Sequence, residues 1–298
     1  MTVEKKEKKV STAIEEGHGF RSVCYRLWKE NKVAVFCALL IVVFALAAIF
    51  APLLTPYEYD EIVTDSFRLS NPSLSHPLGT DEVGRDVLTR LLYGARISLL
   101  VGIVPTIISM VIGALLGIIA GFVGGKADAV IMRLADIMLA FPSMLLAMVI
   151  MYTLGDGIIN IFLALALVNW ASVARIVRAE TLKLKETEYV EAARSIGVSK
   201  WKIMMRHILP NCIPSLIVLF TLNIPSAILS ESALGFLGLG IEKPMASWGL
   251  MVNTGRQYLY TNPWLSLAPS AAIMLVVLAF NFLGDGLRDV LDPHLKNQ

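Results

Sequence analysis

The nearest approach to a nucleotide site in this sequence is a glycine-rich run, Gly121-Phe122-Val123-Gly124-Gly125-Lys126. A phosphate-binding loop needs glycines at a fixed spacing, so that backbone N–H groups cradle the phosphates, and a Ser or Thr after the lysine for Mg²⁺. This run lacks the first glycine at that spacing and has no hydroxyl residue after Lys126. We therefore predict a glycine-rich helix end with no cofactor in this chain. Any ATP hydrolysis, with its ATP and Mg²⁺, would take place in another chain.

Other catalytic patterns are missing from the sequence. It has no GxSxG, no HExxH and no pair of carboxylates placed for acid–base work. Cys24, Cys37 and Cys212 form no CxxC and have no partner at metal-ligand spacing, and the four histidines are scattered. Apolar packing explains the cysteines. We expect no catalytic residue, no metal site and no enzymatic activity in this chain.

Two carboxylates stand inside apolar runs and are therefore candidates for function. Glu231 lies at one end of its run, where it is a candidate for a translocation pathway or a side chain solvated at the membrane surface. Asp136 follows Arg133 by three residues, which predicts an ion pair along one helix. Three asparagines in such runs are expected to hydrogen-bond between helices: Asn169, Asn223 and Asn281.

The composition places these residues in a membrane. Hydrophobic residues make up 56% of the 298 residues, charged residues 17%, and the mean hydropathy is +0.66. A soluble fold of this size needs far more charge on its surface. The net charge of +2 and the lack of a basic stripe argue against nucleic acid as a partner.

Six apolar runs are long enough to cross a hydrocarbon core of about 30 Å. The first, Val33 to Phe50, follows a polar stretch too long for a signal peptide, so we predict an uncleaved helix. The others lie near 97–123, 134–154, 157–174, 212–234 and 265–284. Within the second run, Gly113, Gly117 and Gly121 are spaced by four and predict a close contact with another helix.

The basic residues predict the orientation. With the N-terminus in the cytoplasm, 20 of the 26 Lys and Arg residues fall on cytoplasmic segments. Such an excess is typical of cytoplasmic loops. We therefore expect both termini in the cytoplasm.

A long polar segment between the fourth and fifth runs, Arg175 to Pro210, has the pattern of an ordered loop. Tyr189, Ala192, Ala193 and Ile196 recur at helical spacing and predict one apolar face. Gly197 then ends this helix in the position of a left-handed cap. A second short helix is expected from the N-cap Ser199, with an apolar face made by Trp201, Met204, Met205 and Ile208. The two helices could lie on the membrane surface or dock in a groove of a cytoplasmic partner.

This loop resembles a known motif. Glu191-Ala192-Ala193, Gly197 and Leu209-Pro210 are similar to the EAA loop of membrane subunits of bacterial ABC importers. The family pattern has isoleucine two residues before the leucine, where this chain has His207. The resemblance implies a coupling helix that rests on an ATPase subunit. It implies this role for Tyr189, Glu191, Ala192, Ala193, Ile196 and Gly197.

Further motifs narrow the resemblance and extend it over nearly the whole chain. They are His76-Pro77-Leu78-Gly79-Thr80-Asp81 with Gly84-Arg85-Asp86, Ala233 to Gly238, Ser247-Trp248-Gly249, and Gly284 to Asp289 with Leu291-Asp292-Pro293. Together they resemble the C-type subunit of the dipeptide/oligopeptide permease family, which includes nickel and glutathione permeases. The resemblance implies a heterodimer with a second permease subunit, two ATPase subunits and an extracytoplasmic peptide-binding protein.

These observations predict an all-α polytopic membrane protein with six transmembrane helices and the type I ABC importer permease fold, in a bacterial cytoplasmic membrane. The expected segments are a cytoplasmic N-terminal segment over 1–32, the first helix with an extracytoplasmic segment over 33–95, a transmembrane core over 96–285 with its coupling loop 175–210, and a cytoplasmic tail over 286–298. The expected function is import of di- or oligopeptides by alternating access. The alternatives are a nickel or glutathione permease, or an ion-coupled secondary transporter that works alone. A secondary transporter is expected to have broken helices and an internal repeat. Candidate breaks are Pro105, Pro142, Pro214 and Pro225, but an internal repeat is not evident in this sequence.

Overall fold

The computed structural model describes residues 26–29, 31–63 and 68–291. Cys24, most of the predicted N-terminal segment and residues 292–298 of the predicted tail lie outside the described residues. The regular structure of the described residues is helical, apart from an isolated bridge between Thr80 and Asp86. The long helices are α3 (Lys32–Ile49), α5 (Val87–Val123), α6 (Gly125–Ala140), α7 (Ser143–Leu154), α8 (Ile158–Leu184), α11 (Leu209–Phe236) and α13 (Trp264–Leu291). The short ones are α4 (Ala51–Leu54), α9 (Glu188–Ser195), α10 (Lys200–Ile203), the π-helical turn η2 (Met204–Ile208), α12 (Trp248–Gly255) and the 3₁₀ turn η3 (Arg256–Tyr258).

The described portion of the chain has five helices that are long and apolar enough to cross a membrane, and a sixth crossing if α6 and α7 are one bent span. The predicted span near 134–154 is divided into α6 and α7, which meet at an angle of 92°. The bend lies at Phe141-Pro142, where Phe141 has the extended backbone favoured before proline. Pro105, Pro214 and Pro225, in contrast, lie inside continuous helices.

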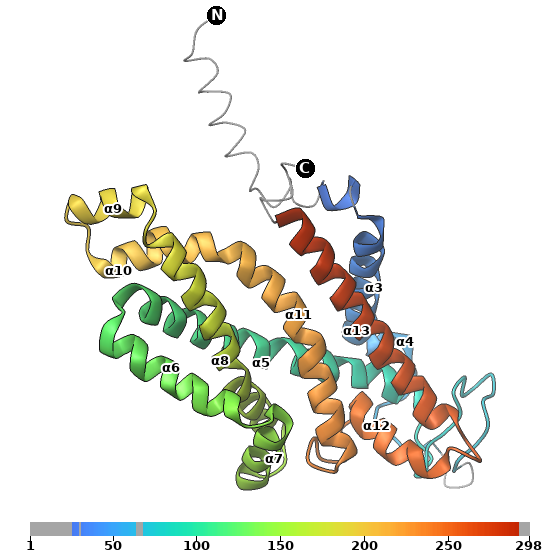
Figure 1. The fold of residues 1–298 in the computed structure, drawn as a ribbon. Helices are drawn as coiled ribbons and strands as arrows, with labels where there is room; N and C mark the ends of the chain where they lie inside the picture. Colours follow the sequence, from blue (N-terminus) through green and yellow to red (C-terminus); the bar gives the residue numbers. More distant parts are fainter. Residues whose placement is uncertain (1–25, 30, 64–67, 292–298) are drawn as a thin grey trace, which may run out of the picture.

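The predicted close contact of α5 is confirmed, and its partner is α8 (Figure 1). A Cβ atom built on each glycine would lie within 3 Å of a backbone carbonyl oxygen of α8: 2.7 Å at Gly113, 2.6 Å at Gly117 and 2.9 Å at Gly121. These glycines therefore let two backbones approach to a distance that a larger residue would prevent.

The bundle has two ends, which we name by the short helices found there (Figure 1). At the α9 end, α5 and α8 finish, and the start of α3 packs against the last turns of α13 through Ala34 and Gly286. At the α12 end, α3 finishes, α5 begins and α12 inserts between α5, α11 and α13. Arg96 of α5 donates hydrogen bonds to the carbonyl oxygens of Ala48 and Ile49 and so satisfies the last turn of α3.

Ion pairs and a buried tryptophan close the α12 end. Asp86 caps α5 by accepting a hydrogen bond from the Thr89 N–H, 2.7 Å away, and its other carboxylate oxygen lies 2.9 Å from His76 Nδ1. The fully buried Trp248 anchors α12, because its Nε1 donates to the Leu91 carbonyl oxygen at 3.0 Å. The His76–Asp86 and Ser247–Gly249 motifs therefore fix this cap of the bundle.

The predicted ion pair of Asp136 with Arg133 is corrected by the structure. Asp136 of α6 pairs instead with Arg175 of α8, at 2.7 Å. A second pair, between Asp128 and Arg178, joins the same two helices at 2.5 Å. The charges of α6 therefore hold it to its neighbour α8.

Candidate coupling surface

The polar loop is shorter than the sequence predicts. Helix α8 continues to Leu184, and α10, η2 and α11 form one continuous helix from Lys200 to Phe236. The predicted boundaries at Arg175 and Pro210 therefore both fall inside helices, and the segment between the two long helices is 185–199. A helix can run past the end of its apolar stretch, because backbone hydrogen bonding does not depend on the polarity of the side chains.

The second predicted helix is thus the first part of the continuous helix from Lys200 to Phe236, and Pro210 does not end it. Pro210 lies in the first turn of α11, where its missing N–H removes a hydrogen bond to the preceding turn. The wider turn η2, Met204–Ile208, lies directly before it. Such single π-helical turns accommodate a break in the regular hydrogen-bond ladder. Ser199 does stand at the N-cap of α10, as predicted, though its side chain makes no capping hydrogen bond.

The inner side of α9 packs on its own chain. Val190 is fully buried and Ala193 is 7% exposed. Both belong to one apolar cluster with residues from the ends of α5 and α8 and from the α10–η2 segment. The other buried members of that cluster are Ala114, Ile118, Phe122, Val173, Val177, Ile203, Met204, Ile208 and Cys212. This packing holds α9 against the end of the bundle.

Gly197 ends α9 as predicted. Its φ is +79°, and its N–H donates to the Arg194 carbonyl oxygen at 3.1 Å. The Val198 N–H donates to the Ala193 carbonyl oxygen, also at 3.1 Å. These two bonds make a Schellman motif, which requires a left-handed residue at the position of Gly197. The motif turns the chain sharply between α9 and α10.

The outer side of α9 carries only some of the predicted apolar face. Tyr189 is 44% exposed and Ile196 80% exposed, and Ala192 and Glu191 are exposed as well. Ala193, however, belongs to the inner side with Val190. The structure therefore divides the predicted face into two layers. Val190 is apolar and lies three residues before Ala193, which is the signal for the inner layer that the sequence analysis missed.

The α10 segment extends the outer surface. Trp201 was expected in one apolar face with Met204 and Ile208, but it is 58% exposed while those two side chains are buried. The rings of Tyr189 and His207 lie 6.4 Å apart, which links α9 to η2. We call the exposed set Tyr189, Ala192, Ile196 and Trp201 the outer layer of the loop.

Glu231, the candidate for the translocation pathway, lies far from this loop, near the α12 end of α11. Its side chain is 1% exposed, and neither carboxylate oxygen has a hydrogen-bond partner among the described residues. The neighbouring Ser232 is in close contact with Gly249 of α12. Glu231 is therefore enclosed by its own chain in this conformation.

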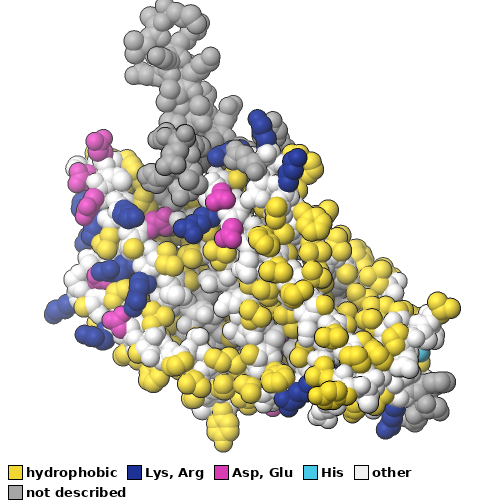
Figure 2. All heavy atoms as spheres, turned by 45° about the vertical axis from the view of Figure 1, so that its right-hand side comes forward, with side chains coloured by type: hydrophobic (Ala, Val, Ile, Leu, Met, Phe, Trp, Pro, Cys, Tyr) yellow, Lys and Arg dark blue, Asp and Glu magenta, His cyan; other side chains and the backbone are white. Residues whose placement is uncertain are grey.

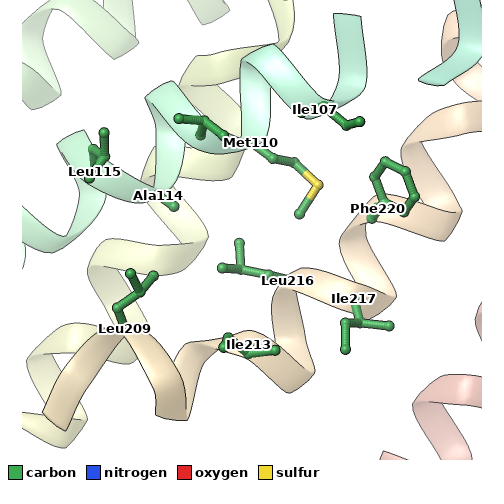
Figure 3. A pocket seen from close by; sticks show the side chains of 10 residues that line it. Ile107, Met110, Ala114, Leu115, Leu209, Ile213, Leu216, Ile217 and Phe220 are labelled. Carbon is green, nitrogen blue, oxygen red and sulfur yellow. The ribbon is translucent and has the colours of Figure 1, made fainter. Parts of the chain in front are cut away.

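An apolar groove of about 400 Å³ lies between α5 and α11 (Figure 3). Side chains that point into it include Met110, Leu216 and Phe220. Its ten lining residues carry no polar side chain. The groove can bind hydrocarbon but offers no hydrogen bond to a charged or polar molecule.

The fold of this chain is shared with solved structures of the MetNI methionine ABC transporter in inward-facing conformations. One matches with a TM-score of 0.56 and 21% identity, over 68% of this chain and 97% of that chain. A second crystal form matches with a TM-score of 0.53. The predicted type I permease fold is confirmed.

The family follows from the sequence comparisons. The model of the binding-protein-dependent transport system inner membrane component matches residues 113–297, and the N-terminal transmembrane domain of oligopeptide transport permease C matches residues 23–72. The dipeptide transport system permease protein DppC of Alkalihalophilus pseudofirmus is 46% identical, over 92% of this chain and 90% of its own length. The glutathione transport system permease protein GsiD of Pectobacterium atrosepticum is 42% identical, over 92% and 91%. This chain belongs to the family of binding-protein-dependent transport system inner membrane components.

This membership decides against the ion-coupled secondary transporter. The chain is a multi-pass membrane permease of a bacterial ABC importer, a class of subunit that is not itself an enzyme.

Proposed function

We propose that this chain forms half of the translocation pathway for di- and oligopeptides and couples it to an ATPase through the outer layer of the α9–α10 loop. The observation that carries the coupling role is the two-sided packing of α9. Its inner side is fixed by Val190 and Ala193, while Tyr189 and Ile196 remain 44% and 80% exposed. A rigid helix with apolar side chains on its free side fits a contact with another protein.

The charges of α9 favour a protein over the membrane surface as the partner. Helices that lie on membranes carry Lys and Arg on their polar face. Helix α9 carries Glu188 and Glu191 in its first turn and Arg194 in its last. These signs complement the helix dipole, but they leave the exposed side of the helix with more negative than positive charge. The neighbouring α10 carries the exposed Lys200 and Lys202 beside Trp201, so anionic lipid headgroups would repel α9 but not the whole outer layer.

The proposed assembly contains a second permease subunit, two ATPase subunits that bind ATP and Mg²⁺, and an extracytoplasmic peptide-binding protein. We place the α9 end, with both termini, in the cytoplasm. The supporting observation is that 20 of the 26 Lys and Arg residues fall on that side of the predicted topology. The α12 end then faces the binding protein.

The proposed cargo is a small peptide. The dipeptide permease at 46% identity and the glutathione permeases at 42–44% both have names that refer to short peptides. Glutathione is thus the second candidate cargo, because the glutathione permeases match as much of this chain as the dipeptide permease does. Uptake of labelled dipeptide, longer peptide, glutathione and Ni²⁺ by the complete importer in vesicles would separate these cargoes.

The coupling role is tested by Ala192→Arg in the complete importer. Ala192 is exposed, so the chain should fold and reach normal levels, while a long charged side chain would be forced into the proposed ATPase contact. We expect ATP-driven peptide uptake to fall at least tenfold and ATPase binding to weaken. The matched control is Ala192→Ser, which keeps a small side chain and should retain uptake. If α9 lies on lipid instead, the arginine would extend to the headgroups and uptake would stay normal, which would refute the coupling role.

A further inference from the structure

Helix α11 separates two surfaces of opposite chemistry. One side lines the apolar groove with Ile213, Ile217 and Phe220 (Figure 3). The other side carries what we call the polar stripe: Asn211, Ser215, Asn223, Ser226 and Ser230. At about 3.6 residues per turn these five positions fall within roughly a third of the helix circumference. Asn211 and Ser226 are exposed, and the other three are partly exposed.

The polar surface continues from α11 onto α8 and α6. The Ser215 hydroxyl donates to Glu180 Oε1 of α8 at 2.7 Å, which joins the stripe to that helix. The exposed side of α8 next to this contact carries Ser172 and Arg175. Arg175 pairs with Asp136 of α6, and the two side chains are 54% and 52% exposed. Figure 1 shows α6, α8 and α11 following one another in this order around the bundle.

The face made by α13 and α3 is apolar at the same depth. Its exposed large hydrophobic side chains on α13 are Leu267, Met274, Leu275, Leu278 and Phe282, and the exposed charges of α13 lie in its last two turns at the α9 end. Figure 2 brings this side forward and shows hydrophobic side chains over nearly all of it, with most of the visible Asp, Glu, Lys and Arg at the α9 end or the edges. Such a surface suits lipid.

Contact with lipid would cost more free energy on the side of α11 that carries the polar stripe than on the apolar face of α13 and α3. Asn211 donates a hydrogen bond to the His207 carbonyl oxygen, and Ser215 donates to Glu180. Asn223, Ser226 and Ser230, in contrast, would expose polar groups to hydrocarbon, and the half-exposed ion pair would expose charge. Polar groups in such helices are found on surfaces that line water-filled cavities or meet other protein. Leu219, Leu222 and Leu229 fall within the same part of the helix circumference and interrupt the stripe. Polar positions nevertheless recur from Asn211 to Ser230, which is the form expected of a pathway across the membrane.

We infer that the polar stripe, with Ser172 and the Arg175–Asp136 pair, is this chain's wall of the aqueous translocation pathway. The inference rests on the proposed function and specifies which residues meet the cargo. Hydroxyl and amide groups both donate and accept hydrogen bonds, so they can form hydrogen bonds with the N–H and C=O groups of any peptide main chain. Several weak contacts of this kind permit passage without tight binding. Glu231 lies on the other side of α11 and does not belong to this wall.

The test compares single cysteines at matched depth in a variant whose Cys24, Cys37 and Cys212 are replaced by alanine. Ser226 lies ten residues before the end of α11, and Leu275 eleven residues after the start of α13, both counted from the α12 end. At 1.5 Å per residue each is about 15 Å from that end. Ser226→Cys probes the stripe at this depth, and Leu275→Cys, whose side chain is 41% exposed in the native chain, probes the apolar face. Ser230→Cys is a shallower probe of the stripe, six residues or about 9 Å from the end of α11. The complete importer is treated with a quaternary-ammonium methanethiosulfonate reagent.

We expect both stripe cysteines to react at least ten times faster than Leu275→Cys, and their modification to stop peptide uptake while modified Leu275→Cys retains it. A transport-competent importer in which the stripe cysteines react no faster than Leu275→Cys would overturn the inference. Fast labelling of the stripe cysteines in an importer that moves no peptide would support the stripe as the pathway wall and refute the peptide function. The failure of the inference and the failure of the proposed function are therefore distinguishable.

Discussion

The α12 end and the α9 end of this chain differ in how far their charged side chains are buried. At the α12 end, charges are buried and paired within the chain: Asp81, Arg85 and Arg90 are only 5–6% exposed. At the α9 end, the loop exposes apolar side chains, with Ile196 at 80% and Trp201 at 58%. The α12 end also exposes apolar side chains, Tyr260 among them, and encloses Glu231 without a hydrogen-bond partner among the described residues, so the two ends differ chiefly in the buried charge cluster. That cluster stabilises the subunit, whereas contact with an ATPase is the role that we propose for the α9 loop.

The largest effect is expected from Asp81→Ala at the α12 end. Asp81 lies 2.7 Å from Arg85 and 3.5 Å from Arg90, and it accepts the Val83 and Arg85 N–H groups. Its removal leaves two buried arginines without their carboxylate, which destabilises a protein by roughly 3–5 kcal/mol. Thermal unfolding of the detergent-solubilised chain should show the loss.

The matched control is Glu82→Ala, because Glu82 is 20% exposed and its contacts with Arg85 and Lys243 are 3.8 and 3.7 Å long. It should change stability by less than about 1 kcal/mol. Equal effects of the two substitutions would contradict the view that buried pairs hold this end.

The next largest effect is expected from Ala193→Arg in the inner layer of α9. Ala193 is 7% exposed within the chain, so a large side chain there overpacks the cluster around Val190 and Ile208. Overpacking of this kind destabilises by about 1–3 kcal/mol, and a buried charge adds to it. The isolated chain should therefore melt at lower temperature, whereas Ala192→Arg should melt normally. A normal melting temperature for Ala193→Arg would place position 193 on the free side of the loop.

A smaller effect is expected from Gly197→Ala. The position has φ +79° with no atom within 4 Å of a new Cβ, so only the left-handed backbone opposes the alanine. That backbone destabilises a residue with a side chain by about 1–2 kcal/mol. Gly197→Asn is the control, because asparagine tolerates this conformation better. Unchanged amide hydrogen exchange of α9 in Gly197→Ala would argue against the role of the cap.

The smallest effect on the chain itself is expected from Ile196→Ser. With 80% of its side chain exposed, Ile196 contributes little to the packing of its own subunit. Thermal unfolding of the isolated chain should change by less than about 0.5 kcal/mol. Affinity for the ATPase, measured with purified subunits, should fall because the outer layer loses apolar area. A clear drop in chain stability would show that the outer layer belongs to the chain's own core.

Much of the fold could be predicted from residue patterns, because local patterns determine local structure. Apolar runs of spanning length located the membrane helices, and Gly197 marked the end of α9 through its backbone freedom alone. Glycines four apart on α5 predicted a close helix contact, because spacing of four places residues on one face of a helix. The identity of α8 as the partner helix was not available from that spacing.

Helix breaks could be predicted only incompletely. A proline removes one hydrogen bond wherever it stands, but the surrounding packing decides whether the helix bends. Pro142 follows a residue with an extended backbone and bends the span by 92°, whereas Pro105 is buried within a continuous helix. The end of α8 was likewise misplaced, because charged residues from Arg175 onward are compatible with a helix that continues past the apolar stretch.

Residue patterns were enough to recognise the class of chain, the number of apolar runs and the loop with the EAA-like motif. Composition, periodicity and motif spacing are properties of consecutive residues, so they are visible before the fold is known. The packing of the helices, in contrast, explains which side of α9 is free, why Asp136 pairs with Arg175, and why Glu231 is enclosed while Ser226 is exposed. Those outcomes depend on which helices meet and at what angle, and the side chains on one helix do not specify the surface that an element far along the chain presents to them.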